Sequence, residues 1–283
     1  MAGTNETVLK QIKRVLEIFK NSDSELRTHF LLSGPSGCGK SFNIAKLVKQ
    51  LDLHFVEVNA AQLTKEGLAG NSLSKALVPL KYIEDKLTVC FVDEFDKLFI
   101  SGNHNECAND STIGVQNEFL KVLEADTTSV FGDYGKYIPI NVSNVLFIFA
   151  GAFNGAEMSL DKLRDFGVKT EFLGRVGLLY NMEKPTVAEY IEALKNSKQF
   201  AMYSELFPMS AKKKAEAVDA ISKEIVAAYD TNTLGFRLVN TLINQYFISG
   251  GFPEKTPNKS VFHKKMQLEH EGGSVCKSAQ SKH

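Results

Sequence analysis

The chain lacks an excess of charge of either sign. Its 283 residues include 33 lysines and arginines against 33 aspartates and glutamates, so the formal net charge is zero. A protein that coats nucleic acid uniformly carries a basic excess, which this composition excludes, although a local basic patch stays compatible with it. Internal repeats and low-complexity tracts are absent as well.

Long hydrophobic runs are also missing. The longest wholly apolar run, Val145–Phe153, is much shorter than the roughly 20 residues that a transmembrane helix needs. The N-terminus has lysines but no apolar stretch before a small-residue cleavage site, so we expect no signal peptide. The four cysteines show no paired spacing, which favours free thiols in a reducing compartment. These absences predict a soluble protein of the cytoplasm.

Short apolar segments alternate with segments of helical periodicity over the first two thirds of the chain. Such alternation predicts an α/β fold, in which a parallel sheet is covered by helices on both faces. The predicted strands are His29–Ser33, His54–Val58, Leu87–Val92, Val145–Ala150 and Leu178–Asn181, and the predicted helices are 8–19, Phe42–Gln50, Ser72–Lys86 and Val115–Glu124.

The pattern changes after Met182, where helical segments follow one another without a strand. These segments are Val187–Asn196, Ala211–Ala228 and Phe236–Ser249. We therefore predict a large α/β domain over residues 1–181 and a small all-helical domain over residues 182–252. Residues 253–283 are polar and begin with two helix-breaking prolines, Pro253 and Pro257, so we predict a flexible tail.

A glycine-rich loop follows the first predicted strand and precedes a helix. The segment Gly34–Ser41 reads G-P-S-G-C-G-K-S and satisfies the pattern G-x-x-x-x-G-K-[ST] of a phosphate-binding loop, or P-loop. Its glycines let backbone N–H groups point at phosphates, and the helix N-terminus adds a favourable dipole. The residues predicted to bind ATP in and beside this loop are Gly34, Pro35, Ser36, Gly37, Cys38, Gly39, Lys40, Ser41 and Phe42.

Two of these residues have specific predicted roles. Lys40 is expected to reach the β- and γ-phosphates, where it contributes to catalysis, and the Ser41 hydroxyl is expected to bind Mg²⁺. The alternative is a glycine-rich turn that matches the pattern by chance, which the correct strand before it and helix after it disfavour. ATP binding is therefore the predicted function of this loop.

A pair of acidic residues ends the third predicted strand. Asp93 and Glu94 follow the apolar segment Val89–Val92, at the end of the sheet where ligands of open α/β folds bind. We expect Asp93 to lie beside the loop that follows a neighbouring strand and to hold Mg²⁺ through water. Glu94 is expected to orient and polarise the attacking water, as a hydrolase requires.

At this point the chain resembles the AAA+ superfamily, in particular its ClpX/HslU branch of protein unfoldases. The segments that carry the resemblance are Gly34–Ser41, Val92–Leu98, Val115–Glu124, Asn144–Phe153, Asp165–Arg175 and Leu234–Arg237. The resemblance covers about residues 8–250 and implies a P-loop NTPase sheet followed by a helical lid. It also implies an ATPase that forms a homo-oligomeric ring, usually a hexamer, and acts on a polypeptide substrate in a central pore.

The resemblance assigns further residues to the site. Arg175 looks like the arginine finger that reaches the γ-phosphate bound by a neighbouring subunit, and such an arginine is worth roughly 10³–10⁵ in rate. Arg237 looks like the sensor-2 arginine that ties the lid to the nucleotide. The polar sensor-1 position falls near Gly151–Ala152, with Asn154 the nearest polar side chain.

The chain departs from the family at three places. Residues 1–28 hold no cysteine, so we expect no N-terminal zinc domain. Only Ala156–Asp165 fill the interval in which ClpX proteins carry a loop that docks onto the ClpP protease, which argues against a ClpP-type partner. The substrate-gripping pore loop carries Leu68 and Ala69 where the family has an aromatic and an aliphatic residue. Ser129–Lys136, with Phe131, Tyr134 and Lys136, is the candidate for a second pore loop.

Two other classes of function stay open. The first is an ATP-dependent loader or motor on nucleic acid, which would need basic contacts that the neutral charge does not favour. The second is an assembly scaffold that uses ATP to hold a ring and scarcely turns over. The altered pore loop is compatible with the scaffold, whereas Glu94 argues for turnover.

Overall fold

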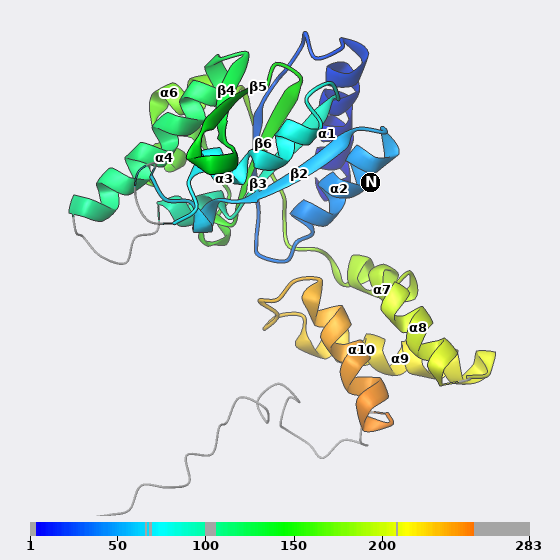
Figure 1. The fold of residues 1–283 in the computed structure, drawn as a ribbon. Coiled ribbons are helices and arrows are strands. Elements are labelled where there is room, and N and C mark those ends of the chain that lie inside the picture. The colour runs from blue at the N-terminus through cyan, green and yellow to red at the C-terminus, as the bar shows by residue number, and fades with distance from the viewer. Residues whose placement is uncertain (1–3, 66, 68–69, 100–105, 208, 252–283) are drawn as a thin grey trace, which may run out of the picture. The chain divides into compact units, whose positions relative to one another are not determined.

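A computed structural model describes residues 4–65, 67, 70–99, 106–207 and 209–251. Its main sheet has five parallel strands in the spatial order β2-β3-β6-β1-β7 (Figure 1). These strands are β1 (Phe30–Ser33), β2 (His54–Asn59), β3 (Thr88–Asp93), β6 (Val145–Gly151) and β7 (Leu178–Asn181). All five predicted strands are present, and the α/β class is confirmed.

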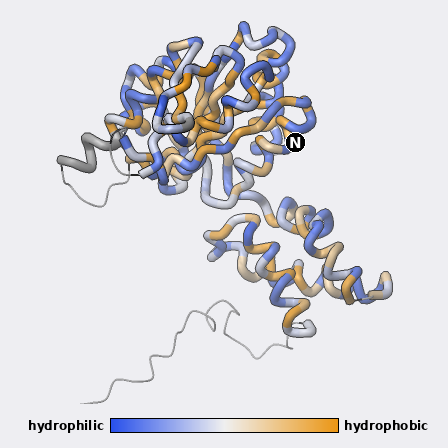
Figure 2. Tube along the Cα trace, viewed as in Figure 1, coloured by the Kyte–Doolittle hydropathy of each residue, from blue (hydrophilic) through white to orange (hydrophobic). Residues whose placement is uncertain are grey.

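Helices cover both faces of this sheet. On one face α1 (Thr4–Asn21) and α2 (Lys40–Gln50) pack, and on the other lie α3 (Leu73–Ala76), α4 (Glu106–Glu124) and α6 (Thr170–Arg175) (Figure 1). Strand residues alternate between two apolar clusters, with Phe30 and Leu32 facing α1 and Leu31 facing α4. Figure 2 shows the apolar residues concentrated along the strands, as expected for a sheet buried on both faces.

Two details of the large domain differ from the prediction. The helix predicted for Ser72–Lys86 is wrong, because only Leu73–Ala76 are α-helical and a 3₁₀ turn follows over Val78–Tyr82. Pro79 explains the break, since its ring clashes with the preceding turn of an α-helix. The strands β1 and β3 are also not neighbours, because β6 lies between them and pairs with both.

The segment between α4 and β6 forms an antiparallel hairpin. Its strands are β4 (Thr127–Phe131) and β5 (Tyr137–Asn141), joined by a tip over residues 132–136. The sequence predicted only a loop here, because both strands alternate exposed and buried residues and are too polar to resemble core strands. Between β6 and β7 lie the short helix α5 (Leu160–Asp165) and α6.

The chain divides into two compact units. The first comprises residues 1–193 with 233–238, and the second comprises residues 194–232 with the chain from Val239 onward. The helices that follow β7 are α7 (Val187–Lys195), α8 (Lys198–Leu206), α9 (Ala211–Ala228) and α10 (Arg237–Ser249), of which α8 was not predicted. The two units divide after residue 193, later than the predicted domain boundary after residue 181. The division by function, into a nucleotide-binding domain and a lid, stays a prediction.

Aromatic stacking holds the second unit together. Phe247 of α10 stacks on Tyr203 and Phe207 around α8, with ring centroids 4.7 and 6.1 Å apart. Asn244 accepts hydrogen bonds from Tyr203 (3.0 Å) and from Gln199. Across the described residues, no helix combines the length and the apolar character that crossing a bilayer requires. The predicted tail, residues 253–283, lies outside the described residues.

His29 lies buried at the start of β1 and makes one hydrogen bond that depends on its neutral form. Its Nδ1 accepts the backbone N–H of Phe147 on the adjacent strand at 3.0 Å. Burial, with a smaller contribution from the charge of Arg27, lowers the pKa of His29 to about 3. Because the unfolded chain binds this proton near pH 6.5, protonation favours unfolding between about pH 6.5 and 3.

We predict that stability falls with pH through this imidazole. His29→Asn is the matched control, since its Oδ1 can accept the same hydrogen bond without titrating. Between pH 7.5 and 5, the free energy of unfolding measured in urea should fall by about 2 kcal/mol more in the parent than in the variant. If the two free energies fell in parallel with pH, folding would not lower the pKa of His29.

Candidate functional site

The P-loop runs from the buried strand β1 into α2. Gly37 and Gly39 adopt positive φ values of 72° and 97°, and Gly39 caps the helix. Both conformations favour glycine because a Cβ is strained in the left-handed region. The loop therefore has the curled backbone that the pattern predicts, with its N–H groups at the start of a helix.

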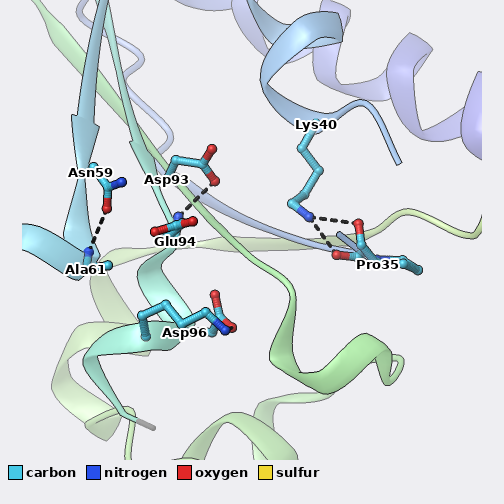
Figure 3. A network of polar contacts seen from close by, with 9 residues as sticks. Pro35, Lys40, Asn59, Ala61, Asp93, Glu94 and Asp96 are labelled. Carbon is cyan, nitrogen blue, oxygen red and sulfur yellow. Dashed lines mark hydrogen bonds and ion pairs between the residues drawn. The ribbon is translucent and has the colours of Figure 1, made fainter. Parts of the chain in front are cut away.

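Lys40 is turned back onto this loop. Its Nζ donates hydrogen bonds to the carbonyl oxygens of Gly34 (2.6 Å) and Pro35 (3.1 Å), and its side chain is almost fully buried (Figure 3). A buried ammonium needs such partners, because removing it from water is costly. The ammonium lies within the curl of the loop, where the predicted phosphates would bind.

The other predicted loop residues differ in exposure. Cys38 is buried, and burial raises the pKa of its thiol, so this side chain is neutral. Ser36 and Phe42 are exposed. The side chain of Phe42 therefore lies on the surface at the first turn of α2.

A hydrogen bond joins the P-loop helix to the end of β3. The Ser41 hydroxyl donates to Oδ2 of Asp93 at 3.0 Å, and Oδ1 of Asp93 accepts the backbone N–H of Glu94 at 2.8 Å. The sequence placed Asp93 beside a neighbouring strand. Although β6 lies between, the carboxyl ends of β1 and β3 still open on one edge of the sheet.

The donor set at this edge fits Mg²⁺. A hydroxyl and a carboxylate are hard oxygen ligands, and one carboxylate with substrate phosphates is a usual set for this ion. Partial burial, with a smaller contribution from the charge of Asp93, raises the pKa of Glu57 on β2. In the described part of the chain, no three His, Cys, Asp or Glu side chains gather as metal ligands, so phosphate oxygens would have to complete the set.

Glu94 has a strained backbone at the centre of the site. It is exposed and adopts a left-handed conformation with φ 55° and ψ 31°, immediately after Asp93 (Figure 3). Such a conformation is uncommon for a residue with a long side chain, and it persists only where the surroundings impose it. The next residue, Phe95, is completely buried.

A segment from the end of the first unit lies against the P-loop. The backbone N–H of Phe236 donates to the carbonyl oxygen of Gly37 at 2.8 Å. Gly235 approaches so closely that a Cβ on it would lie 2.2 Å from the Gly37 oxygen, and a Cβ on Gly37 would lie 2.2 Å from the Leu234 oxygen. Arg237, the predicted sensor-2 arginine, follows directly in the sequence.

Arg175 does not join this group of residues. It ends α6, is about half exposed, and forms an ion pair with Glu124 at the end of α4, with N and O 2.9 Å apart. Within the described residues, no hydrogen bond or ion pair links it to Lys40, Asp93 or Glu94. The sequence did not reveal the pairing with Glu124, because the two residues lie on different helices and only packing brings them together.

The remaining predicted positions are placed differently. Leu68 and Ala69 of the predicted pore loop lie outside the described residues. Asn154 is exposed with φ 59°, just after the end of β6. The second candidate pore loop is the tip of the β4–β5 hairpin, where Tyr134 is fully exposed and Phe131 packs edge-on against Tyr137 at 5.9 Å.

The sequence is similar to those of known proteins. Residues 30–165 match the AAA family, described as the ATPase family associated with various cellular activities. The ATP-dependent Clp protease ATP-binding subunit ClpX of Bacteroides thetaiotaomicron is 31% identical over 168 residues, which cover 54% of this chain and 41% of the relative. ClpX of Porphyromonas gingivalis is 24% identical over 302 residues, covering 90% of this chain and 73% of the relative.

These matches extend over the site but not over the whole of the relatives. The AAA match begins at β1 and includes the P-loop, Asp93 and Glu94. In the Bacteroides relatives, the chain spans only 40–41% of their length. The comparisons therefore support ATP hydrolysis by this chain. They do not extend to the activity of a complete ClpX protein.

The contact between Gly235 and Gly37 predicts a strong effect of one methyl group. Gly235→Ala should weaken ATP binding at least about fivefold, because the new Cβ would displace the P-loop backbone. Gly250→Ala is the control, since Gly250 also has positive φ (70°) but no atom within 4 Å of an added Cβ. Titration with a fluorescent ATP analogue measures both, and equal affinities would contradict the importance of this contact.

Proposed function

We propose that this chain, which is similar to the AAA family and to ClpX proteins, hydrolyses ATP in the cytoplasm within a homo-oligomeric ring of six copies. It would use that hydrolysis to unfold or remodel protein substrates. The observation that carries the proposal is the hydrogen bond from Ser41 to Asp93 beside an exposed Glu94. A structural strand end has no need of a strained glutamate next to a P-loop.

Each residue of the site has a chemical task in this proposal. Lys40 leaves its backbone partners and binds the β- and γ-phosphates. Ser41 and Asp93 would hold Mg²⁺, which would supply positive charge beside the phosphates. Glu94 orients a water molecule and accepts its proton as the water oxygen bonds to the γ-phosphorus. The bond between that phosphorus and the bridging oxygen breaks, and ADP leaves with phosphate as the second product.

Two arginines complete the proposed site. Arg175 would leave Glu124 and reach the γ-phosphate held by the adjacent copy, where it stabilises charge in the transition state. Its exposure at the end of α6 supports this role, because a side chain that serves a neighbouring copy must lie on the surface. Arg237 would sense the nucleotide from the segment that contacts Gly37.

The β4–β5 hairpin supplies the proposed contact with substrate. Tyr134 is fully exposed at its tip, Tyr137 is half exposed, and the ammonium of Lys75 lies 5.4 Å from the centre of the Phe131 ring. Exposed aromatic rings provide large apolar contact area with few rotatable bonds, which suits transient binding of an unfolded polypeptide. Leu68 in the first pore loop would add a smaller apolar contact.

The proposal includes action without a protease. In the interval where ClpX proteins carry a docking loop, Ala156 leads within a few residues into α5, whose first turn is capped by Ser159 accepting from the N–H of Lys162 at 3.3 Å. The interval is thus taken up by a short capped helix. Remodelling of complexes, with release of intact products, fits this arrangement better than delivery to a protease.

We predict that the hairpin tip can be separated from ATP hydrolysis. Tyr134→Ala should reduce remodelling of a model protein complex at least about tenfold, with ATPase activity within about twofold of the parent, because the loss of an aromatic contact affects substrate binding alone. Leu26→Ala, which removes an exposed apolar side chain elsewhere, is the control. Phosphate release and complex dissociation are measured in parallel on the full chain.

The outcomes distinguish the alternatives. Loss of remodelling with intact ATPase in Tyr134→Ala and in Leu68→Ala supports a pore that grips polypeptide. Remodelling at the parental rate in both variants would contradict it. ATP binding without turnover in the parent would instead favour an assembly scaffold.

A further inference from the structure

A cluster of phenylalanines lies directly beneath the acidic end of β3. Phe95 stacks on Phe172 of α6, with ring centroids 5.1 Å apart and planes 20° apart, and packs against Phe149 of β6 at 4.9 Å. Phe119 of α4 packs edge-on against both Phe95 and Phe149. All four rings are completely buried, so this cluster joins the turn after β3 to α4, β6 and α6.

Phe95 is the residue that follows the strained Glu94. The ring of Phe95 is buried in the cluster, and Asp93 ends the buried strand β3. Glu94 joins these two residues and adopts the left-handed conformation. A glutamate pays for this conformation in free energy, and the surrounding packing must over-determine it. If the ring were smaller, the turn could relax and the Glu94 carboxylate would lose its fixed position.

The same ring reaches the helix that carries Arg175. Phe172 lies one helical turn before Arg175, so the stack fixes the middle of α6. The start of α6 is held by Gln116 of α4, whose amide donates to the Gly167 oxygen and accepts from the Lys169 N–H at 3.1 and 3.0 Å. The segment that follows β3 thus contacts α6 through the ring of Phe95.

We propose that Phe95 is a positioning residue for both predicted catalytic residues, holding Glu94 in its strained turn and fixing Arg175 through the stack on Phe172. The inference rests on the proposed function, because it assigns tasks to Glu94 and Arg175 in ATP hydrolysis. It adds that a buried side chain without contact to ATP sets the rate of the chemical step. The helix α2 packs in the apolar cluster on the other face of the sheet, so we expect the change at this stack to affect ATP binding less than the rate of hydrolysis.

The test compares three substitutions of phenylalanine by leucine. Phe95→Leu and Phe172→Leu should each lower kcat at least about tenfold while the KM for ATP stays within about twofold, since binding by the P-loop is preserved. Phe91→Leu is the control, because Phe91 of β3 is equally buried but belongs to the apolar cluster on the other face of the sheet, where its ring pairs with Phe55. Its kcat should stay within about twofold of the parent.

The double variant Phe95→Leu/Phe172→Leu adds a readout that general destabilisation would not produce. If both rings act through one stack, the double variant should lose less activity than the product of the two single losses. Independent, multiplying losses would overturn the proposal, as would an unchanged kcat or a raised KM in Phe95→Leu. Should Phe95→Leu not fold, judged by circular dichroism, the kcat and KM of Phe172→Leu decide the question in the same way.

Failure of this inference is distinguishable from failure of the proposed function. A parent chain without ATPase activity would contradict the proposed function itself. A parent that hydrolyses ATP, together with a Phe95→Leu variant of equal kcat, would contradict only the role of Phe95.

Discussion

The hydrogen bond between Ser41 and Asp93 is the interaction on which the candidate site depends. It connects α2, the helix after the P-loop, to the end of β3. In the sheet, β3 lies two positions from β1, the strand that leads into the P-loop. This geometry is possible because parallel strands open all their carboxyl ends on one edge, and β6 keeps β1 and β3 in register. The five-stranded sheet thus serves as the frame that brings two distant sequence motifs within hydrogen-bonding distance.

Backbone positions with positive φ gather at this edge of the sheet. Gly37, Gly39 and Gly235 have positive φ where the P-loop and the segment before α10 meet, and Glu94 has positive φ across from them. The unfavourable free energy of the Glu94 conformation is offset by packing elsewhere. This packing includes the aromatic cluster beside the end of β3 and the apolar clusters on both faces of the sheet. Local strain and a well-packed support are therefore parts of one arrangement.

Sequence patterns predicted the strands and the P-loop because those signals are local. An apolar run bounded by Gly34, or by Asp93, indicates a buried strand end without reference to the rest of the chain. Pro79 could have warned against a helix over Ser72–Lys86, and Ser197 could have indicated the start of α8 by capping it. The β4–β5 hairpin escaped prediction because its strands are largely exposed.

Contacts between distant elements could not be predicted in this way. The pairing of Arg175 with Glu124, the approach of Gly235 to Gly37 and the stack of Phe95 on Phe172 all depend on how helices pack on the sheet. Resemblance to ClpX indicated which residues matter, whereas only the structure indicates what holds them. The roles of the individual site residues stay predictions that kinetics must test.

The most direct test of the account is the hydrolysis of ATP by Glu94→Gln. This change keeps the size of the side chain but removes the base, so the variant should bind ATP with near-parental affinity and release phosphate at least about a hundredfold more slowly. Lys40→Ala should lose binding as well, which separates the two roles. Near-normal phosphate release by Glu94→Gln would contradict the assignment of the catalytic base, and with it the proposed use of this site.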